Sequence, residues 1–109
     1  RLEEAAQILA PVVEKPADPI TGELARQRLA RVLSAQEKYD EALALFASQA
    51  PEAFTAIREE VRGDILVQAN RLEEAYSAYA SARKALTNPA AEGALLMKLD
   101  DLPAPNKDA

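Results

Sequence analysis

Pairs of adjacent carboxylates are the residues of this sequence that come nearest to a catalytic arrangement. The chain holds 18 Asp and Glu residues, and its pairs include Glu3/Glu4, Glu59/Glu60, Glu73/Glu74 and Asp100/Asp101. General acid–base catalysis needs two carboxyl groups in one cleft with separated pKa values. Neighbouring residues on a helix instead point in different directions, and acidic side chains in a first turn offset the helix dipole. We therefore interpret the pairs as solvated, structural residues.

The sequence contains no histidine and no cysteine. The serine and threonine hydroxyls therefore have no histidine base, and the chain offers no thiolate as a nucleophile or as a ligand for a soft metal. Gly63 has no glycine near it in sequence, which argues against a phosphate-binding loop. The sequence predicts no catalytic, cofactor-binding or metal-binding residue, and hence a protein that is not an enzyme.

The charges of the chain point to a protein as its partner. The net charge is −5, and the 13 Lys and Arg residues are interleaved with carboxylates along the sequence. Because binding to phosphates depends on clustered basic side chains, nucleic acid is not expected as a partner. We expect no small-molecule substrate either.

Helices are the elements expected to position these side chains. Hydrophobic residues make up 49% of the chain while aromatic residues make up 5%, and alanine and leucine are the best helix formers. No stretch alternates apolar with polar residues as a half-buried strand would. Pro11 predicts a kink or an early end in the first helix. The expected helices cover about residues 1–14, 21–35, 39–49, 51–69, 72–86 and 89–102.

A five-residue motif recurs along the chain. Arg1–Ala5 is identical to Arg71–Ala75, and Lys38–Ala42 has the same order of basic, apolar, acidic, acidic and alanine. From alanine to alanine the intervals are 42 − 5 = 37 and 75 − 42 = 33 residues. Short links between helices make neighbours antiparallel, and hairpins repeated in this way stack to cover their apolar faces. The pattern predicts an all-α fold, an α-solenoid of helical hairpins.

The spacing of small and bulky residues resembles the tetratricopeptide repeat. The small residue of a first helix, the alanine of the second and the bulky residue after it are Ala30, Ala42 and Phe46, then Gly63, Ala75 and Tyr79. The resemblance implies close approach of paired helices. We divide the chain into a half repeat 1–15, repeats 20–50 and 51–87, a capping helix 89–102 and a disordered tail 103–109.

Three segments carry a narrower likeness. Leu29–Val32, Val61–Leu66 and Leu96–Leu102 look like the C-terminal half of the YfgM-like family, the ancillary subunits of the bacterial Sec translocon. The resemblance implies an inner-membrane protein with an anchor absent here. Its repeats would face the periplasm and meet translocon subunits, periplasmic chaperones or exported polypeptides. A generic cytoplasmic repeat adaptor is the alternative, and an enzyme domain ranks below both.

The first helix of each repeat is expected to line a partner-binding groove. By repeat alignment, the inward positions are Leu24, Gln27, Arg31, Ser34, Ile57, Glu60, Asp64 and Val67. Glu60 and Asp64 would repel the C-terminal carboxylate of a peptide, so the groove favours an extended or helical segment of a protein partner.

The first predicted helix carries an apolar stripe without an obvious cover. The stripe consists of Leu2, Ile8, Leu9 and Val12. An exposed apolar patch of this kind favours association. We expect earlier repeats to cover it in a longer protein, and expect this chain to self-associate through the Arg1–Val13 helix or to cover the stripe with another of its segments.

Overall fold

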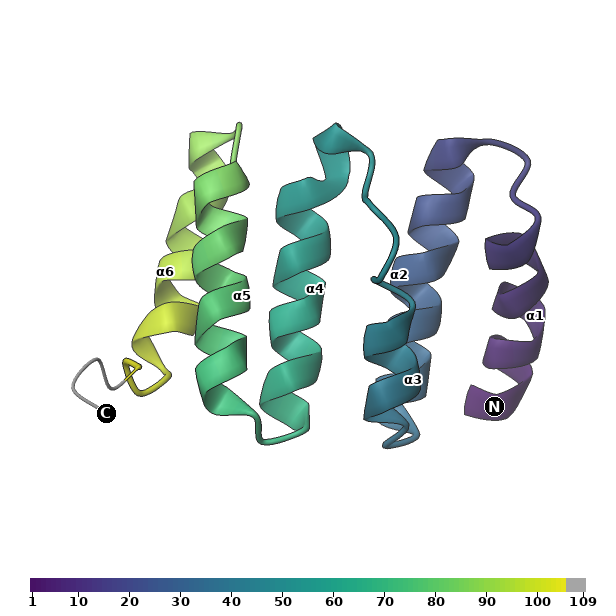
Figure 1. Ribbon diagram of the computed structural model, residues 1–109, viewed down its shortest axis with the longest axis horizontal. Coiled ribbons are helices and arrows are strands. Elements are labelled where there is room, and N and C mark those ends of the chain that lie inside the picture. The colour runs from purple at the N-terminus through teal and green to yellow at the C-terminus, as the bar shows by residue number, and fades with distance from the viewer. Residues whose placement is uncertain (106–109) are drawn as a thin grey trace. The chain divides into compact units, whose positions relative to one another are not determined.

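The computed structural model describes residues 1–105, and every regular element among them is helical (Figure 1). Residues 106–109 of the predicted tail lie outside the described residues. Two compact units divide the chain, residues 1–54 and 55–109, and each is described by itself. The elements are α1 (Leu2–Glu14), α2 (Pro19–Ala35), α3 (Tyr39–Ala44), the 3₁₀ helix η1 (Glu52–Phe54), α4 (Thr55–Gln68), α5 (Leu72–Ala85), the 3₁₀ helix η2 (Pro89–Ala91) and α6 (Glu92–Asp100).

In the first unit α1 and α2 form an antiparallel hairpin (Figure 1). Pro11 does not end α1, which continues to Glu14 and closes with a bond from the Lys15 amide to the Pro11 carbonyl at 3.0 Å. The start of α2 lies at Pro19 rather than at the expected Thr21. Asp18 caps this end because its carboxylate accepts a bond from the amide of Thr21 at 2.8 Å, and Pro19 is suited to a first helical position.

The third helix is shorter than its sequence pattern predicts. It ends at Ala44, whereas we expected it to reach about residue 49. The amides of Leu45, Phe46 and Ala47 bond to carbonyls three residues back, so the backbone tightens and leaves the α-helical path. Arg26 of α2 also donates to the Leu45 carbonyl at 2.8 Å, which satisfies that acceptor without a further helical turn.

In the second unit α4 and α5 lie antiparallel, and α6 packs against α5 (Figure 1). The core between α5 and α6 is built from Tyr79, Ala82, Leu95 and Leu99. Pro51 does not open an α-helix directly, because η1 precedes α4. The expected start at Asn88 and Pro89 is present, since the Asn88 side chain accepts a bond from the Ala90 amide at 3.1 Å and begins η2.

The link from α2 to α3 and the link from α4 to α5 use the same backbone turn. Glu37 and Asn70 both have a left-handed backbone, with φ of 61° and 60°. In each turn the following amide donates to the carbonyl five residues back at 2.8 Å. This bond closes a helix end in the manner of the Schellman motif.

Small residues lie where the helices approach one another. Ala30, Ala42 and Ala75 have no exposed surface, and Gly63 is buried. A Cβ atom at Gly63 would overlap the edge of the Tyr79 ring, so only glycine allows α4 and α5 to approach as they do. The predicted fold class, all-α with repeat-like antiparallel hairpins, is confirmed. The division into individual repeats stays a prediction.

Candidate protein-binding surface

Four of the eight predicted groove residues are exposed. Leu24 and Ile57 each keep 49% of their surface accessible, and Val67 keeps 37%. Arg31 is exposed as well. These four side chains come from α2 in the first unit and from α4 in the second. Because they are accessible to solvent, these four side chains remain the candidates for contact with a partner.

Two of the predicted groove residues are buried instead. Gln27 is 7% exposed and Ser34 is 3% exposed. The amide nitrogen Nε2 of Gln27 donates to Oε2 of Glu23, one turn earlier on α2, at 3.0 Å. Repeat alignment places a residue on a helix face but says little about how deeply that face is covered. The surface of these two side chains is not presented to solvent.

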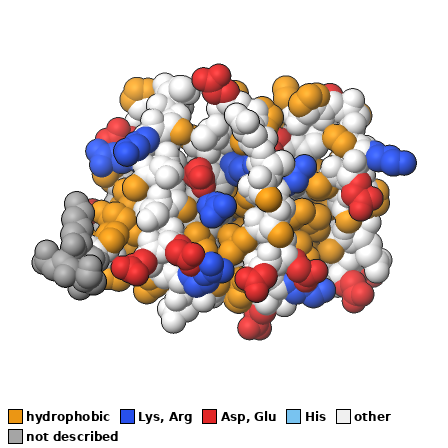
Figure 2. Space-filling model, in the orientation of Figure 1, with side chains coloured by type: hydrophobic (Ala, Val, Ile, Leu, Met, Phe, Trp, Pro, Cys, Tyr) orange, Lys and Arg blue, Asp and Glu red, His pale blue; other side chains and the backbone are white. Residues whose placement is uncertain are grey.

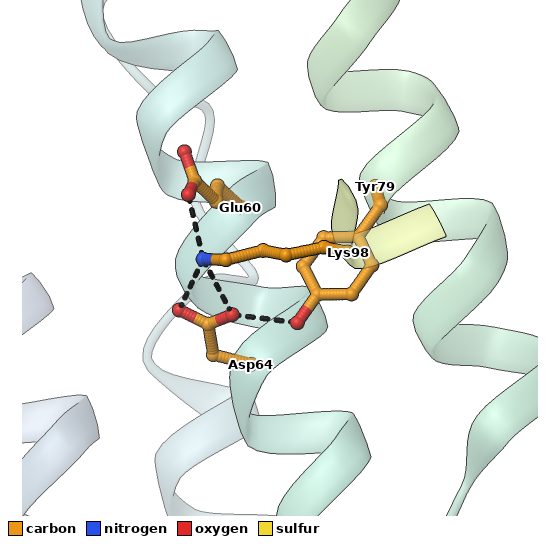
Figure 3. A network of polar contacts seen from close by, with 4 residues as sticks. All are labelled: Glu60, Asp64, Tyr79 and Lys98. Atoms are coloured by element: carbon orange, nitrogen blue, oxygen red, sulfur yellow. Dashed lines mark hydrogen bonds and ion pairs between the residues drawn. The ribbon is translucent and has the colours of Figure 1, made fainter. Parts of the chain in front are cut away.

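Glu60 and Asp64 belong to a polar network that spans three helices (Figure 3). Lys98 reaches from α6 and its ammonium nitrogen Nζ lies 2.7 Å from Oε2 of Glu60. The same nitrogen lies 3.0 and 3.3 Å from the two carboxylate oxygens of Asp64. The Tyr79 hydroxyl donates to Oδ1 of Asp64 at 2.6 Å, and Lys98 Nζ lies 5.6 Å from the centre of the Tyr79 ring.

The network keeps Lys98 charged. Partial burial by itself would lower the pKa of the Lys98 ammonium. The hydrogen bonds to Glu60 and Asp64 outweigh that effect and raise the pKa above its ordinary value. The two carboxylates were expected to give a groove its negative charge, but Lys98 largely compensates that charge from within the chain. The arrangement fastens α6 to α4 and offers no separated acid and base for catalysis.

The other acidic pairs agree with the structural interpretation. Glu3/Glu4, Glu73/Glu74 and Asp100/Asp101 are exposed. The remaining pair, Glu59/Glu60, was expected to be solvated but is half-buried. Glu59 forms an ion pair with Arg62, and Glu60 forms one with Lys98. Across the face drawn in Figure 2, acidic and basic side chains are scattered among hydrophobic ones. In residues 1–105 no three Asp or Glu residues are grouped so as to hold a metal ion.

The apolar stripe of α1 is partly open, because Leu2 and Ile8 are exposed while Leu9 and Val12 are half-buried. No residue of α1 is buried, and Ile8 keeps 71% of its surface accessible. Beside it, two adjoining hollows of about 300 and 470 Å³ lie between α1 and α2. We call them together the α1/α2 hollow. The lining residues of the two hollows are Ala5, Ile8, Leu9, Thr21, Leu24, Ala25, Arg28, Arg31 and Val32.

Arg28 and Lys98 are the residues that sequence reasoning missed. Arg28 lines both parts of the α1/α2 hollow, and Lys98 is the centre of the network on α4. A signal for both was present in the sequence. Each basic residue follows the start of an Arg-Leu-Glu-Glu-Ala motif by 27 positions, from Arg1 to Arg28 and from Arg71 to Lys98.

Comparison with known proteins gives a family and a relative. Residues 1–104 match the sequence model of the family described as Tetratricopeptide repeat-like domain. Over 92 residues the chain is 34% identical to the Ancillary SecYEG translocon subunit of Neisseria gonorrhoeae (strain ATCC 700825 / FA 1090), a match covering 84% of this chain and 44% of the relative. The chain thus spans less than half of that relative's length. No solved structure gives a significant match.

These matches agree with the residues that carried the resemblance. The predicted likeness to ancillary Sec translocon subunits is confirmed by the relative, and the predicted likeness to the tetratricopeptide repeat is confirmed by the family. Within residues 1–105 no helix is long and apolar enough to cross a membrane. The small residues at the helix contacts and the match over residues 1–104 lead to one conclusion: the chain belongs to the tetratricopeptide repeat-like domain family.

Proposed function

We propose that the chain is a non-enzymatic scaffold that binds other polypeptides and acts as an accessory of the Sec translocon. The observation that carries the proposal is the presence of open apolar side chains on one helix of each unit, Leu24 on α2 and Ile57 and Val67 on α4. Faces of this kind are the usual binding surfaces of helical repeat domains. The name of the relative supports the translocon as the setting.

The finer parts of the proposal concern place and partner. We propose a periplasm-facing position at the inner membrane, with translocon subunits, exported polypeptides or periplasmic chaperones as partners. An apolar, uncharged contact suits segments of polypeptides that have not yet buried their own apolar side chains. A longer, membrane-anchored form of the protein would place α2 and α4 where such segments emerge.

The test is cross-linking in the bacterium that makes the protein. A photo-reactive residue is placed at Ile57 or Val67 of the protein as it occurs there, and captured chains are identified by mass spectrometry. We expect capture of translocon subunits or exported polypeptides. The control position is Met97 on α6, which is 70% exposed but lies outside the predicted groove. Equal capture from Met97 would contradict the groove, and capture of cytoplasmic complexes alone would favour a cytoplasmic adaptor.

The side chains that carry the contact are tested by substitution. Ile57→Asp and Val67→Asp place a charge on an apolar contact and leave the buried face of α4 unchanged. Because an unpaired charge is costly to remove from water, we expect capture from a neighbouring position to fall about tenfold or more. Unchanged capture with the protein still folded would show that this face is not used.

We also propose that the isolated chain self-associates through the open stripe of α1. The stripe lies beside the α1/α2 hollow and includes Ile8 and Leu2, which are 71% and 44% exposed. Two copies that bring these stripes together would remove both from water.

A further inference from the structure

The hairpin of α1 and α2 recurs as the hairpin of α5 and α6 at a fixed interval. Arg1–Ala5 is identical to Arg71–Ala75, an interval of 71 − 1 = 70 residues. The same interval, 88 − 18 = 70, relates the capping residue Asp18 to the capping residue Asn88, and each is followed by a proline in the first helical turn. The two segments therefore correspond residue by residue without a gap.

In the second unit α4 covers the α5/α6 hairpin. Ala75, Ala78 and Tyr79 on the inner face of α5 are at most 5% exposed. Gly63 brings the backbone of α4 against the Tyr79 ring. Lys98 reaches from α6 to Glu60 and Asp64 of α4 (Figure 3). Helix α4 thus contacts both α5 and α6.

In the first unit the corresponding face is open. At the interval of 70, the counterparts of Ala75, Ala78 and Tyr79 are Ala5, Ile8 and Leu9, and all three line the α1/α2 hollow. Ile8 is 71% exposed, where Ala78 is 5% exposed. The hairpin is therefore repeated, but the first unit has no helix in the place that α4 occupies in the second.

The charges of the hollow also match those of the covered hairpin. The counterpart of Lys98 is Arg28, because 98 − 28 = 70, and Arg28 lines both parts of the hollow. The other charged lining residue is Arg31, and no carboxylate is among the lining residues. In a chain of net charge −5 this is a basic, apolar site, and it complements carboxylates spaced like Glu60 and Asp64.

We propose that the α1/α2 hollow is the seat of a helix with the chemistry of α4, joined to the chain ahead of Arg1 as α4 is joined ahead of Arg71. Its two carboxylates, four residues apart, pair with Arg28, and a small residue between them lies against Leu9. In α4 these positions are Glu60, Asp64 and Gly63. The partner contact proposed at Ile57 and Val67 lies on α4, outside this hollow. Leu24 and Arg31 line the hollow, and this helix would cover them.

The test restores the missing helix with the chain's own sequence. A copy of residues 51–70 is placed directly before Arg1, so that the native connection from α4 to Arg71–Ala75 is reproduced at the identical Arg1–Ala5. We expect a higher melting temperature than that of the parent chain. We also expect hydrogen exchange with solvent to slow by about tenfold or more, for the amides of α1 relative to the parent chain and for those of the added helix relative to an unfolded segment. An added helix that exchanges like an unfolded segment, with the melting temperature unchanged, overturns the proposal.

A charge reversal isolates the role of Arg28. In the added copy, the residues copied from Glu60 and Asp64 are changed to lysine, which sets two ammonium groups against Arg28. We expect this change to remove the gain in melting temperature, and Arg28→Glu in the same chain to restore part of it. Lysines that leave the gain intact contradict the assignment of Arg28.

Measuring self-association tests whether the α1/α2 hollow is occupied by a second copy of the chain instead of by a preceding helix. If the parent chain associates through the hollow, the added helix should make it monomeric by light scattering. An extended chain that still associates, with Ile8 at the contact, would make the hollow an interface between copies and overturn the proposal.

Discussion

Gly63 is the residue on which the close packing of α4 against α5 depends. We expect Gly63→Ala to destabilise the chain by about 1–3 kcal/mol, because the new methyl group overlaps the Tyr79 ring and that ring is almost fully buried. Urea unfolding followed by circular dichroism measures the change.

Gly93 provides the matched control for this substitution. It also lies in a helix, but a Cβ atom there would meet nothing within 4 Å. Gly93→Ala should therefore stabilise the chain by about 0.5–1 kcal/mol through helix propensity. Equal effects at the two glycines would mean that the contact with Tyr79 does not limit the packing.

Lys98 makes the stability of the second unit depend on alkaline pH. Its pKa is raised in the folded chain by hydrogen bonds to Glu60 and Asp64, which outweigh burial. A raised pKa means that the stabilisation is complete below the ordinary lysine value of 10.5 and is lost as pH rises through the folded value. In a double-mutant cycle of Lys98→Met and Glu60→Gln, we expect a coupling of about 0.5–1 kcal/mol at neutral pH.

A second ion pair in the same unit is a control for the loss of the Lys98–Glu60 coupling at alkaline pH. Arg83 and Glu92 form an exposed ion pair at 3.2 Å, and a guanidinium does not deprotonate in this range. The coupling of Lys98 with Glu60 should disappear above the folded-state pKa while that of Arg83 with Glu92 changes little. A Lys98 coupling that is constant with pH would contradict the ion-pair account.

The residues of this network show what sequence reasoning can reach. Repeat alignment placed Glu60 and Asp64 on one face of a helix, because that placement depends on local spacing alone. Their partner Lys98 lies 38 and 34 residues away in sequence, and only the packing of α6 brings it near. Burial of Gln27 and Ser34 likewise depends on packing, which a helical period does not specify.

At the scale of elements, Asp18 fixes where α2 begins. The pKa of its carboxyl is lowered, first by the bond from the backbone amide of Thr21 and then by the Thr21 hydroxyl. A lowered pKa gives stability above the ordinary value of 3.8, and the stability is lost as pH falls through the folded value. We expect Asp18→Ala to lower the melting temperature by several degrees, because the Thr21 amide loses its acceptor.

Asp18→Asn separates the hydrogen bond from the charge. Asparagine keeps an acceptor for the Thr21 amide, so most of the stability at neutral pH should remain, while the part of the acid dependence due to residue 18 disappears. Thermal melts across the acid range measure both effects. If the asparagine variant lost as much as the alanine variant, the charge rather than the bond would define the cap.

Helix boundaries were predicted with uneven success, since α2 begins at Pro19 instead of Thr21 and α4 at Thr55 instead of Pro51, while both end within one residue of the expected position. Proline and a capping side chain mark a start in the local sequence, as at Asp18–Pro19 and Asn88–Pro89, where the structure begins α2 and η2. The end of α3 has no such mark. It coincides with a hydrogen bond from Arg26, 19 residues earlier, to the Leu45 carbonyl, a contact that no local pattern encodes.

At the scale of the whole molecule, the open stripe of α1 predicts association between copies. We expect light scattering at high protein concentration to show a mass above that of one chain, and Ile8→Glu to return the chain to a monomer. The control is Met97→Glu, because Ile8 and Met97 are almost equally exposed, at 71% and 70%. A parent chain that stays monomeric at every concentration would contradict the prediction.

Both helix links that use a left-handed residue have a consequence for the chain as a whole. Asn70 is a residue type that tolerates this conformation, whereas Glu37 is not, and its side chain is exposed. The first unit can therefore be made slightly more stable by changing one surface residue, Glu37. A change of Glu37 to asparagine or glycine should raise the stability of the fold without altering any contact between helices. The added stability would allow the chain to tolerate a destabilising but functionally useful substitution at another position.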